Sequence, residues 1–433
     1  MWEQTLRFFS LQDANVRYVV FGSILLAGAT GVLGCFAFLR KRSLLGDAIA
    51  HATLPGVCLA YLSTGSKEPY VLLLGAITTG WLGTLCVDWI RRFSPVKEDA
   101  AIGIVLSVFF GAGILLLTTI QSMGQASQAG LDKFLFGQTA SLMKRDILIL
   151  GGLAFFLCVV CFLAFKEFKL LCFDVEFARS IGLPVRLLET VLTTLVVAAI
   201  AIGLQMVGVV LMAALLITPA AAARQWTDNL TRMVWLSGLI GAFSGVAGSF
   251  ISSLAPRMPT GPWMVVTLSI LFGLSLILSP QRGYLTRLFR HTQTRTTIAA
   301  ENILSTMYRY AEPNGRFLRP VSVRDILRYR SLTSVGALTV LRSLKRQGLV
   351  SETRGGWLLT ELGIKSAENL LRRHRLWELY LTEQLNIPPH RVHRSADEVE
   401  HWITQDQEDQ LVSLLDSPLR DPHEREIPQR KDE

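Results

Sequence analysis

Runs of apolar residues, each close to the length that spans a bilayer, dominate residues 1–283 of this 433-residue chain. A helix of about 20 apolar residues crosses a membrane core of about 30 Å. Nine segments reach or approach that length: 18–39, 49–62, 71–90, 100–120, 147–165, 187–204, 206–223, 233–253 and 263–279. We therefore predict that residues 1–283 form an all-α polytopic domain in the lipid bilayer, with about nine transmembrane helices.

Two parts of this pattern are irregular. Segment 49–62 is short and polar at its start, and 187–223 is one apolar stretch interrupted only by Gly203 and Gln205. Irregular backbone at membrane depth is tolerated where protein or water satisfies its polar groups, so such spans often line a transport pathway.

The basic residues between the spans predict an orientation. With the N-terminus outside, the inner loops contain thirteen Lys and Arg residues, against seven on the outer side. Cytoplasmic loops carry an excess of Lys and Arg. Nine crossings then leave the C-terminal part in the cytoplasm.

Residues 284–433 have a different composition. They contain 23 Lys and Arg and 20 Asp and Glu, against 20 and 14 in the longer part before them. All six cysteines precede residue 284, and six of the seven histidines follow it. This partition excludes a disulfide-stapled secreted fold, and it excludes a zinc ribbon in the polar part, which has no thiolate.

Asp47 and His51 give the strongest local signal, in the segment R-S-L-L-G-D-A-I-A-H-A-T-L-P-G (42–56). Residues four apart share one face of a helix. A carboxylate and an imidazole on one face suit a divalent transition metal, and ionisable groups inside a span are functional by default. The alternative is that Asp47 caps the helix while His51 packs against a neighbour.

Five blocks, in order, carry a resemblance. They are G-D-A-I-A-H-A-T-L-P-G, K-E-D-A-A-I-G-I-V-L-S-V-F-F-G (97–111), G-L-D-K-F-L-F-G (130–137), F-D-V-E-F-A-R-S-I-G-L-P (173–184) and V-G-V-V-L-M-A-A-L-L-I-T-P-A-A-A-A (207–223). Over residues 15–283 the chain resembles the membrane permease of bacterial metal-ion ABC importers, the zinc, manganese and iron class.

This resemblance implies a multi-pass protein of the bacterial inner membrane that pairs with a second permease copy or a paralogue. It also implies a cytosolic ATPase and an extracytoplasmic metal-binding protein as partners. Carried over by motif, Asp47 and His51 are the transient metal site of the pathway. Since no G-x-x-x-x-G-K-[ST] loop occurs in the chain, we expect another subunit to hydrolyse ATP and this chain not to be an enzyme.

Block 173–184 falls in a predicted inner loop and resembles the coupling helix that docks in a groove of the ATPase. Its candidate contact residues are Phe173, Asp174, Phe177 and Arg179. The alternative is an ordinary solvated loop. Cys158 and Cys161 form a C-x-x-C inside an apolar span, which favours a packed pair over a redox or metal site.

In the polar part, residues 284–298 are predicted as a linker and residues 299–371 as a winged helix-turn-helix domain. Amphipathic segments 321–328 and 333–347 precede two short strands joined at Gly355-Gly356. Residues 316–375 hold 13 Lys and Arg against four acidic residues, as phosphate binding requires. The candidate DNA contacts are Thr333, Ser334, Arg342, Lys345, Arg346 and Arg354, with Ser331 beside them. The alternative is a protein-interaction module with a solvated or lipid-facing basic surface.

Residues 372–433 are predicted as helices for metal binding and dimerisation, followed by a tail. Six residues fall at helical spacings: His374, Glu378, His393, Asp397, Glu400 and His401. Nitrogen and oxygen ligands without sulfur favour Mn²⁺ or Fe²⁺ over a closed structural zinc site. Scattered surface charges are the alternative.

These segments and D-P-H-E-R-E-I-P (421–428) resemble the metal-dependent repressors of the diphtheria-toxin-repressor family over residues 298–428. The resemblance implies a dimer that binds operator DNA when a metal is bound. It assigns His374, Glu378 and His393 to one metal site and Asp397, Glu400 and His401 to the other. Two departures stand out. The first family ligand falls near Asn302, with Glu301 next to it as a substitute, and Asp397 replaces a Cys or Glu.

Three hypotheses follow for a chain that joins a Mn²⁺, Fe²⁺ or zinc importer to a metal sensor. The tail is cleaved off as a free repressor, or it remains attached and gates transport when cytosolic metal is high. The third is a secondary transporter or channel with an unrelated regulatory tail. The coupling-helix block favours an ABC partner.

Overall fold

The computed structural model describes residues 5, 8–66, 68–122, 137, 144–255, 258–312, 319–329 and 333–429. Block 130–137 lies outside the described residues except for Gly137, as does Ser331. The chain divides into two compact units, an N-terminal unit (Met1–Arg287) and a C-terminal unit (Leu288–Glu433).

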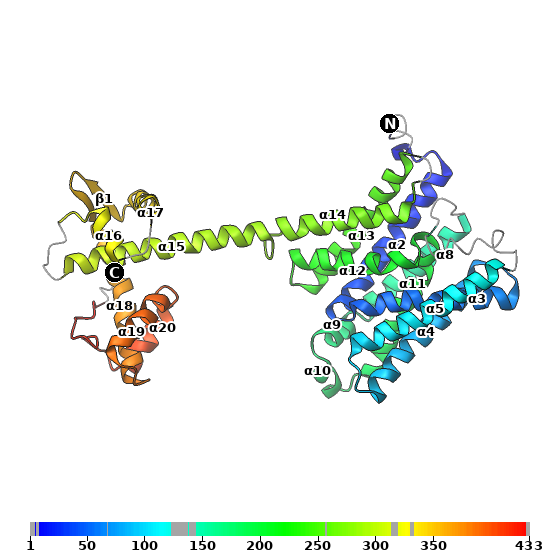
Figure 1. Ribbon diagram of the computed structural model, residues 1–433, viewed down its shortest axis with the longest axis horizontal. Helices are drawn as coiled ribbons and strands as arrows, with labels where there is room; N and C mark the ends of the chain where they lie inside the picture. Colours follow the sequence, from blue (N-terminus) through cyan, green and yellow to red (C-terminus); the bar gives the residue numbers. More distant parts are fainter. Residues whose placement is uncertain are drawn as a thin grey trace. The chain divides into compact units, whose positions relative to one another are not determined.

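The N-terminal unit is helical throughout its described part (Figure 1). Its helices are α2 (Ala14–Leu39), α3 (Ser43–Thr64), α4 (Pro69–Phe93), α5 (Glu98–Ser122), α8 (Lys144–Leu163), α9 (Phe165–Phe173), α10 (Val175–Ser180), α11 (Val185–Val207), α12 (Val209–Trp226), α13 (Leu230–Ser253) and α14 (Thr260–Leu278). Among the described residues, nine helices are long and apolar enough to cross a membrane. The prediction of about nine spans is confirmed.

The division of the apolar stretch 187–223 differs from the expectation. α11 ends at Val207 and α12 begins at Val209, so the break lies at Gly208 and not at Gly203 or Gln205. Gly208 has a φ of 87°, a conformation that glycine adopts without a steric penalty. Gly203 serves packing instead, because a Cβ there would lie 2.3 Å from the Sδ of Met212.

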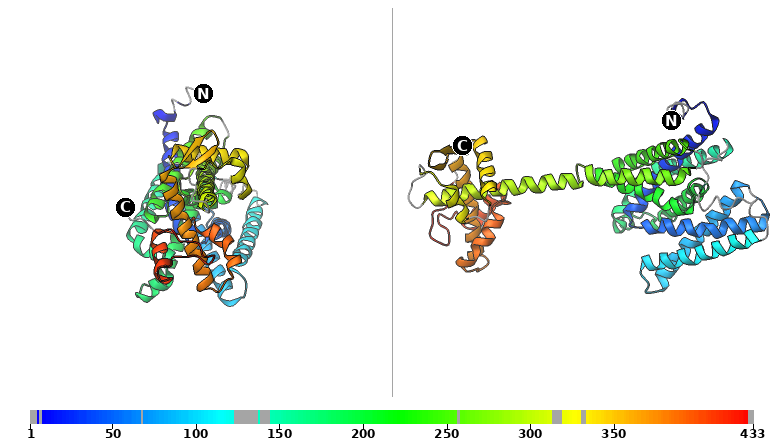
Figure 2. Two further views of the ribbon diagram at one scale, coloured as in Figure 1. Left: turned by 90° about the vertical axis from the view of Figure 1, so that its left-hand side faces the viewer. Right: turned by 45° about the horizontal axis from the view of Figure 1, so that its top comes forward.

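Close packing holds α3 against its neighbours. A Cβ on Gly56 of α3 would lie 2.0 Å from the carbonyl oxygen of Gly75 on α4, so these two backbones touch, as membrane helices do at small residues. An apolar cluster that includes Ala48, Val87 and Ile102 joins α3, α4 and α5 on a second side. The three helices run side by side in Figure 1 and in the right-hand view of Figure 2. This packing fixes the rotation of α3, on which Asp47 and His51 lie.

The C-terminal unit contains most of α15 (Tyr284–Ala311) and the elements after it: α16 (Val323–Tyr329), α17 (Ser334–Arg346), β1 (Val350–Thr353), β2 (Gly356–Leu359), α18 (Glu361–Glu383), α19 (Pro389–Val399) and α20 (Gln405–Leu414). β1 and β2 pair antiparallel, with Val350 opposite Leu359, and an isolated bridge joins Val321 to Trp357. A core that includes Ile303, Ile326, Leu341 and Trp357 packs these elements together. The predicted winged helix-turn-helix followed by a helical domain is confirmed.

Segment 284–298, predicted as a linker, is helical and forms the first half of α15. Its threonines fit a helix because their hydroxyls donate to carbonyl oxygens of the preceding turn. Thr292 donates to the carbonyl oxygen of Leu288 at 3.1 Å, and Thr296 donates to that of Gln293 at 2.8 Å. The polar composition therefore reflects an exposed helix.

Candidate metal sites and interaction surfaces

Asp47 and His51 lie one turn apart on α3, as predicted. The Nε2 atom of His51 is 3.6 Å from Oδ1 of Asp47, with side chains 14% and 39% exposed. The other ring nitrogen of His51, Nδ1, is buried and has no hydrogen-bond partner in the part of the chain that the structure describes. The ring packs edge-on against Phe110 of α5, with centroids 4.7 Å apart.

The capping alternative for Asp47 does not hold, because the N-cap of α3 is Arg42 and Asp47 lies inside the helix. The contact of His51 with Phe110 is the packing that the alternative foresaw. This packing leaves Nε2 of His51 facing the carboxylate of Asp47, so that one nitrogen and one oxygen point toward the same position. This pair can offer two ligands to a divalent cation.

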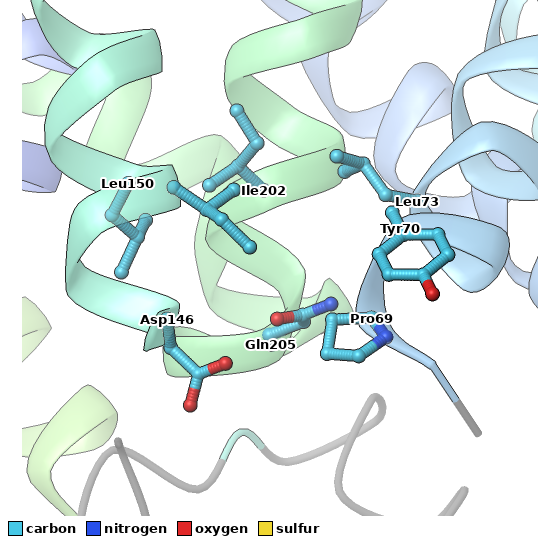
Figure 3. A pocket seen from close by; sticks show the side chains of 8 residues that line it. Pro69, Tyr70, Leu73, Asp146, Leu150, Ile202 and Gln205 are labelled. Atoms are coloured by element: carbon cyan, nitrogen blue, oxygen red, sulfur yellow. The ribbon is translucent and has the colours of Figure 1, made fainter. Parts of the chain in front are cut away.

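A small pocket between α4, α8 and α11 lies elsewhere in this unit (Figure 3). Its lining includes the polar side chains of Tyr70, Asp146 and Gln205, and neither Asp47 nor His51 takes part. The candidate cation pair therefore sits outside this pocket.

The candidate coupling residues surround α10 and have different roles. The carboxylate of Asp174 caps this helix by accepting a hydrogen bond from the backbone N–H of Phe177 at 2.8 Å. Arg179 forms an ion pair with Glu176 at 2.8 Å. The rings of Phe173 and Phe177 are 57% and 51% exposed.

Ile181, which the sequence pattern did not single out, is 52% exposed just after α10. Together Phe173, Phe177 and Ile181 form an exposed apolar patch, which we call the α10 patch. Ala178, on the same helix, is fully buried and anchors it to the unit. The α10 patch is thus the exposed apolar side of a helix whose other side packs on the unit.

The candidate DNA contacts lie on α17 and at the tip of the hairpin. Thr333 caps α17 by accepting a hydrogen bond from the N–H of Gly336 at 3.2 Å. Ser334, Arg342, Arg346 and Arg354 are exposed. Lys345 differs, because its Nζ atom lies 2.7 Å from Glu352 of β1, and this contact lowers the pKa of Glu352.

The first predicted metal set meets at Glu378. Its Oε1 atom lies 2.9 Å from Nε2 of His374 and accepts a short hydrogen bond from Nδ1 of His393. His374 and Glu378 are buried on α18, while His393 on α19 is half exposed. One ligand atom from each of the three lies within 4.8 Å of the others.

The second predicted set begins on the other side of the same imidazole. Nδ1 of His374 lies 2.5 Å from Oε2 of Glu400 and 3.6 Å from Oδ1 of Asp397. These three residues form a second group with ligand atoms within 4.8 Å of one another. His374 therefore stands between two neighbouring sets of ligands, instead of belonging to one of them only.

His401 joins the second set through α15. Its Nδ1 atom lies 2.6 Å from Oε2 of Glu301, and its Nε2 atom lies 3.8 Å from Oε1 of Glu400. Asn302, at the position of the family's first ligand, has its Oδ1 atom buried without a hydrogen-bond partner among the described residues. The structure thus brings Glu301, and not Asn302, into contact with the cluster.

Three polar atoms in or beside this cluster are buried without hydrogen bonds to any described residue: Oε1 of Glu400 and Nε2 of His401 within it, and Oδ1 of Asn302 next to Glu301. Buried polar atoms normally have a hydrogen-bond partner. Several unpaired ones close together are explained if an ion binds among them. Imidazole and carboxylate donors without sulfur suit Mn²⁺ or Fe²⁺. The residues present therefore fit a divalent metal.

The hydrogen bonds within the cluster shift two pKa values. Burial lowers the pKa of His374, but its hydrogen bonds to Glu378 and Glu400 outweigh burial and raise the pKa above 6.5. Burial raises the pKa of Glu378, but the hydrogen bonds and charges of His374 and His393 lower it to about 2.

His423 is a residue that the sequence reasoning did not pick out, although it named the surrounding segment 421–428. The ring of His423 stacks on that of His393, with centroids 4.6 Å apart and an interplanar angle of 16°. Its Nε2 atom is buried without a hydrogen-bond partner in the described ranges. The C-terminal tail therefore brings an additional imidazole to the first set.

These features define a helical membrane protein with a winged-helix tail that carries a cluster of candidate metal ligands. Residues 12–279 match the ABC 3 transport family, and residues 360–429 match the metal binding and dimerisation domain of iron dependent repressors. The chain belongs to the ABC 3 transport family, and it is a metal transport permease with a C-terminal repressor-like domain.

Individual relatives agree with this assignment. The manganese transport system membrane protein MntC of Bacillus subtilis is 45% identical over 381 residues, which cover 88% of this chain and 87% of the relative. The zinc transport system membrane protein TroC of Treponema pallidum is 45% identical over 285 residues, covering 66% of this chain and 95% of the relative. The solved structure of PsaBC from Streptococcus pneumoniae in complex with Fab has a TM-score of 0.59 at 31% identity, covering 65% of this chain and 98% of that chain.

Proposed function

We propose that this chain is the permease subunit of an ATP-driven importer for Mn²⁺ or Fe²⁺, with zinc as the alternative substrate. We further propose that its C-terminal unit lies in the cytoplasm and regulates by binding the same kind of metal. The observation that carries the transport proposal is the Asp47–His51 pair inside α3. The identity of relatives named for manganese and for zinc supports the class of substrate.

In this proposal Asp47 and His51 form a transient binding site for the substrate ion. A cation that enters a membrane span loses its hydration shell, and the carboxylate of Asp47 and the Nε2 of His51 replace part of it. Phe110 holds the imidazole from the side, and α3 holds both residues through its packing on α4 and α5. A site with few protein ligands releases its ion easily, as transport requires.

A second permease copy, or a paralogue, completes this site in our proposal. First-row divalent ions take four or more ligands, whereas the described residues of one chain offer the two of this pair here. Asp47 is 39% exposed, so its carboxylate is available to a neighbouring subunit. An extracytoplasmic metal-binding protein would deliver the ion to the opposite face from the ATPase.

We infer that a cytosolic ATPase subunit docks on the α10 patch. Aromatic residues in grooves typically supply much of the binding energy of an interface, and Phe173 and Phe177 are exposed on a helix that Ala178 anchors. In this proposal Asp174 keeps the helix in shape by capping it. Arg179, paired with Glu176, sits at the polar edge of the patch.

Metal uptake tests the transport proposal. In manganese-starved bacteria that lack their own importers, the full chain expressed with its ATPase and binding protein restores uptake. Asp47→Ala and His51→Ala each abolish it, because neither residue alone replaces the lost water ligands. Asp88→Ala, which removes an exposed carboxylate of α4 paired with Arg91, keeps uptake. Normal uptake by both site variants would contradict the proposal.

For the C-terminal unit we propose metal-dependent binding to operator DNA. His374, Glu378 and His393 would hold one ion, and Asp397, Glu400 and His401 a second, with Glu301 as an added ligand. The bound metal would draw α15 and α19 together, and α15 also packs in the core of the winged helix through Ile303. Exposed Arg342, Arg346 and Arg354 would contact phosphates.

A second candidate is that the attached C-terminal unit gates transport. One observation favours it: Glu301 lies on α15, the helix that begins directly after the turn closing α14. The hydroxyl of Thr286, in the first turn of α15, donates to the carbonyl oxygen of Ser279, the C-cap of α14, at 2.8 Å. A movement of Glu301 on metal binding would therefore start on a helix that is anchored to the last span.

Binding of full-length protein in nanodiscs to a pool of random duplex DNA separates these candidates. A regulator of transcription enriches a palindromic sequence with Mn²⁺ and none with a chelator. A gating unit binds Mn²⁺ but enriches no sequence, and then Mn²⁺ on the cytoplasmic face lowers the uptake rate. An immunoblot against a C-terminal tag shows whether the tail is released.

A further inference from the structure

Arg309 brings a positive charge to the candidate regulatory metal site. It lies on α15, about two turns after Glu301, and its Nη2 atom is 3.7 Å from Oδ1 of Asp397. Glu301 contacts His401, so α15 meets the ligands of the second set at two points. One of these points offers a possible ligand and the other a guanidinium.

The hydrogen bonding of Arg309 is incomplete. Its Nε and Nη2 atoms are buried and make no hydrogen bond to any residue that the structure describes. A guanidinium has five N–H donors in a rigid fork, and leaving buried donors unpaired costs free energy. The contact with Asp397 is an ion pair at long range, not a hydrogen-bonded fork. The position of Arg309 is therefore not explained by structural hydrogen bonding.

Charge balance gives a better explanation. Asp397, Glu400 and Glu378 converge around His374, and a cluster of carboxylates without a bound cation repels itself. A guanidinium stays charged at every physiological pH. Arg309 is thus a permanent positive charge at the edge of a group of three carboxylates.

We propose that Arg309 is a built-in counter-cation of the regulatory site and that it sets the metal affinity of that site. Without metal, its charge offsets the carboxylate of Asp397 and holds α15 against α19. When a divalent ion enters, the guanidinium repels it and gives way, so the ion binds more weakly than the donor set alone would allow. The inference rests on the proposed regulatory role, because a sensor needs an affinity near the free metal concentration of the cell.

Arg309 acts in this proposal through its charge and not through its shape. Arg309→Gln should tighten Mn²⁺ binding by about tenfold or more, because the ion no longer meets a cation at short range. Arg309→Lys keeps the charge and should stay within about threefold of the parent. Arg391→Gln, which removes a charge from the exposed start of α19, is the matched control and should leave the affinity unchanged.

Stability gives a second readout that a purely structural role would move differently. Without metal, Arg309→Gln should unfold at a lower temperature, since Asp397 loses a neighbouring positive charge. With Mn²⁺ at a fixed concentration, the same variant should show a larger metal-induced rise in unfolding temperature than the parent, because it binds the ion more tightly. Loss of a residue that only supports the fold would lower the unfolding temperature equally with and without Mn²⁺. It would leave the metal-induced rise unchanged.

The test uses the full chain in detergent, with Asp47→Ala and His51→Ala in every variant so that the transport pair binds no ion. Free Mn²⁺ is measured by electron paramagnetic resonance during titration. Tighter binding by Arg309→Gln, with Arg309→Lys and Arg391→Gln near the parent, supports the inference. Equal affinities of the parent and Arg309→Gln overturn it while the regulatory site stands. No Mn²⁺ binding by the parent overturns the regulatory site and this inference together.

Discussion

The Nδ1 atom of His401 lies 2.6 Å from the Oε2 atom of Glu301, although 100 residues separate them in the chain. The contact joins the residues directly after α19, which ends at Val399, to α15, which precedes the elements of the winged helix. Through this contact Glu301 adds a carboxylate to the regulatory cluster from outside the helices α18, α19 and α20. A metal bound there would connect the two parts of the C-terminal unit.

This contact predicts that Glu301 is a metal ligand. Glu301→Gln should weaken Mn²⁺ binding by the full chain by about tenfold, because one charged ligand is lost. Titration with Mn²⁺ under competition from a chelator measures the loss. Asn302→Ala, the neighbouring change, should alter the affinity little. The reverse result, a loss with Asn302→Ala only, would show that the family position and not Glu301 supplies the ligand.

The shifted pKa values of His374 and Glu378 predict how the metal-free C-terminal unit responds to pH. The raised pKa of His374 contributes stability that is present below about pH 6.5 and is lost as pH rises through the higher folded value. The lowered pKa of Glu378 contributes stability that is present above its usual value of 4.5 and is lost as pH falls toward about 2. The pair therefore stabilises most between about pH 4.5 and pH 6.5.

Hydrogen exchange of the α18 amides in metal-free protein checks this, once intrinsic exchange rates are corrected for pH. Protection should decrease in the parent as pH rises above about 6.5, through the raised pKa of His374. His374→Gln should lower protection at pH 6 and remove the decrease. An equal pH response in the parent and in His374→Gln would show that the ion pair does not titrate in this range.

The α10 patch predicts a double variant that loses its ATPase. Phe173→Ala combined with Phe177→Ala should abolish co-purification, because two exposed aromatic anchors are removed at once. Phe156→Ala, which removes an exposed ring from α8, is the control and should keep it. Asp174→Ala should weaken co-purification more mildly, since losing a helix cap costs about 1 kcal/mol. Intact co-purification by the double variant would place the contact elsewhere.

The exposed arginines of the winged helix predict a graded response in DNA binding. Arg342→Ala and Arg346→Ala should each weaken binding to all sequences and reduce the slope of log K against log[salt] by about one. Lys345→Ala should have a smaller effect, because Lys345 is already paired with Glu352. If all three variants lose the same DNA affinity, the ion pair between Lys345 and Glu352 breaks when the protein binds DNA, and Lys345 contacts phosphate as the arginines do.

Sequence patterns predicted the residues that lie together on one helix. They predicted fewer of the contacts between residues on separate helices. Asp47 and His51, or His374 and Glu378, are four residues apart, so helical periodicity alone places each pair on one face. Glu301 and Asn302 point about 100° apart on a helix, and only the packing of α15 decides which one faces His401. The stacking of His423 on His393 depends on a tail whose path no periodicity describes.

The break between α11 and α12 shows the same limit. Gly203 and Gly208 are two glycines in one apolar stretch, and hydrophobicity does not distinguish a glycine that bends the chain from one that admits a neighbour. The φ of 87° at Gly208 and the closeness of Met212 to Gly203 separate the two roles. Likewise, the threonines of segment 284–298 look like linker residues until their hydrogen bonds within α15 are seen.

The central claim is that one chain carries separate cation sites for transport and for regulation. ATP-dependent uptake of radiolabelled Mn²⁺ into proteoliposomes that contain the full chain and its ATPase tests this most directly. The account predicts uptake by the parent and by Glu400→Ala, and none by Asp47→Ala. Uptake by Asp47→Ala at the parent rate, or its complete loss in Glu400→Ala, would contradict the account.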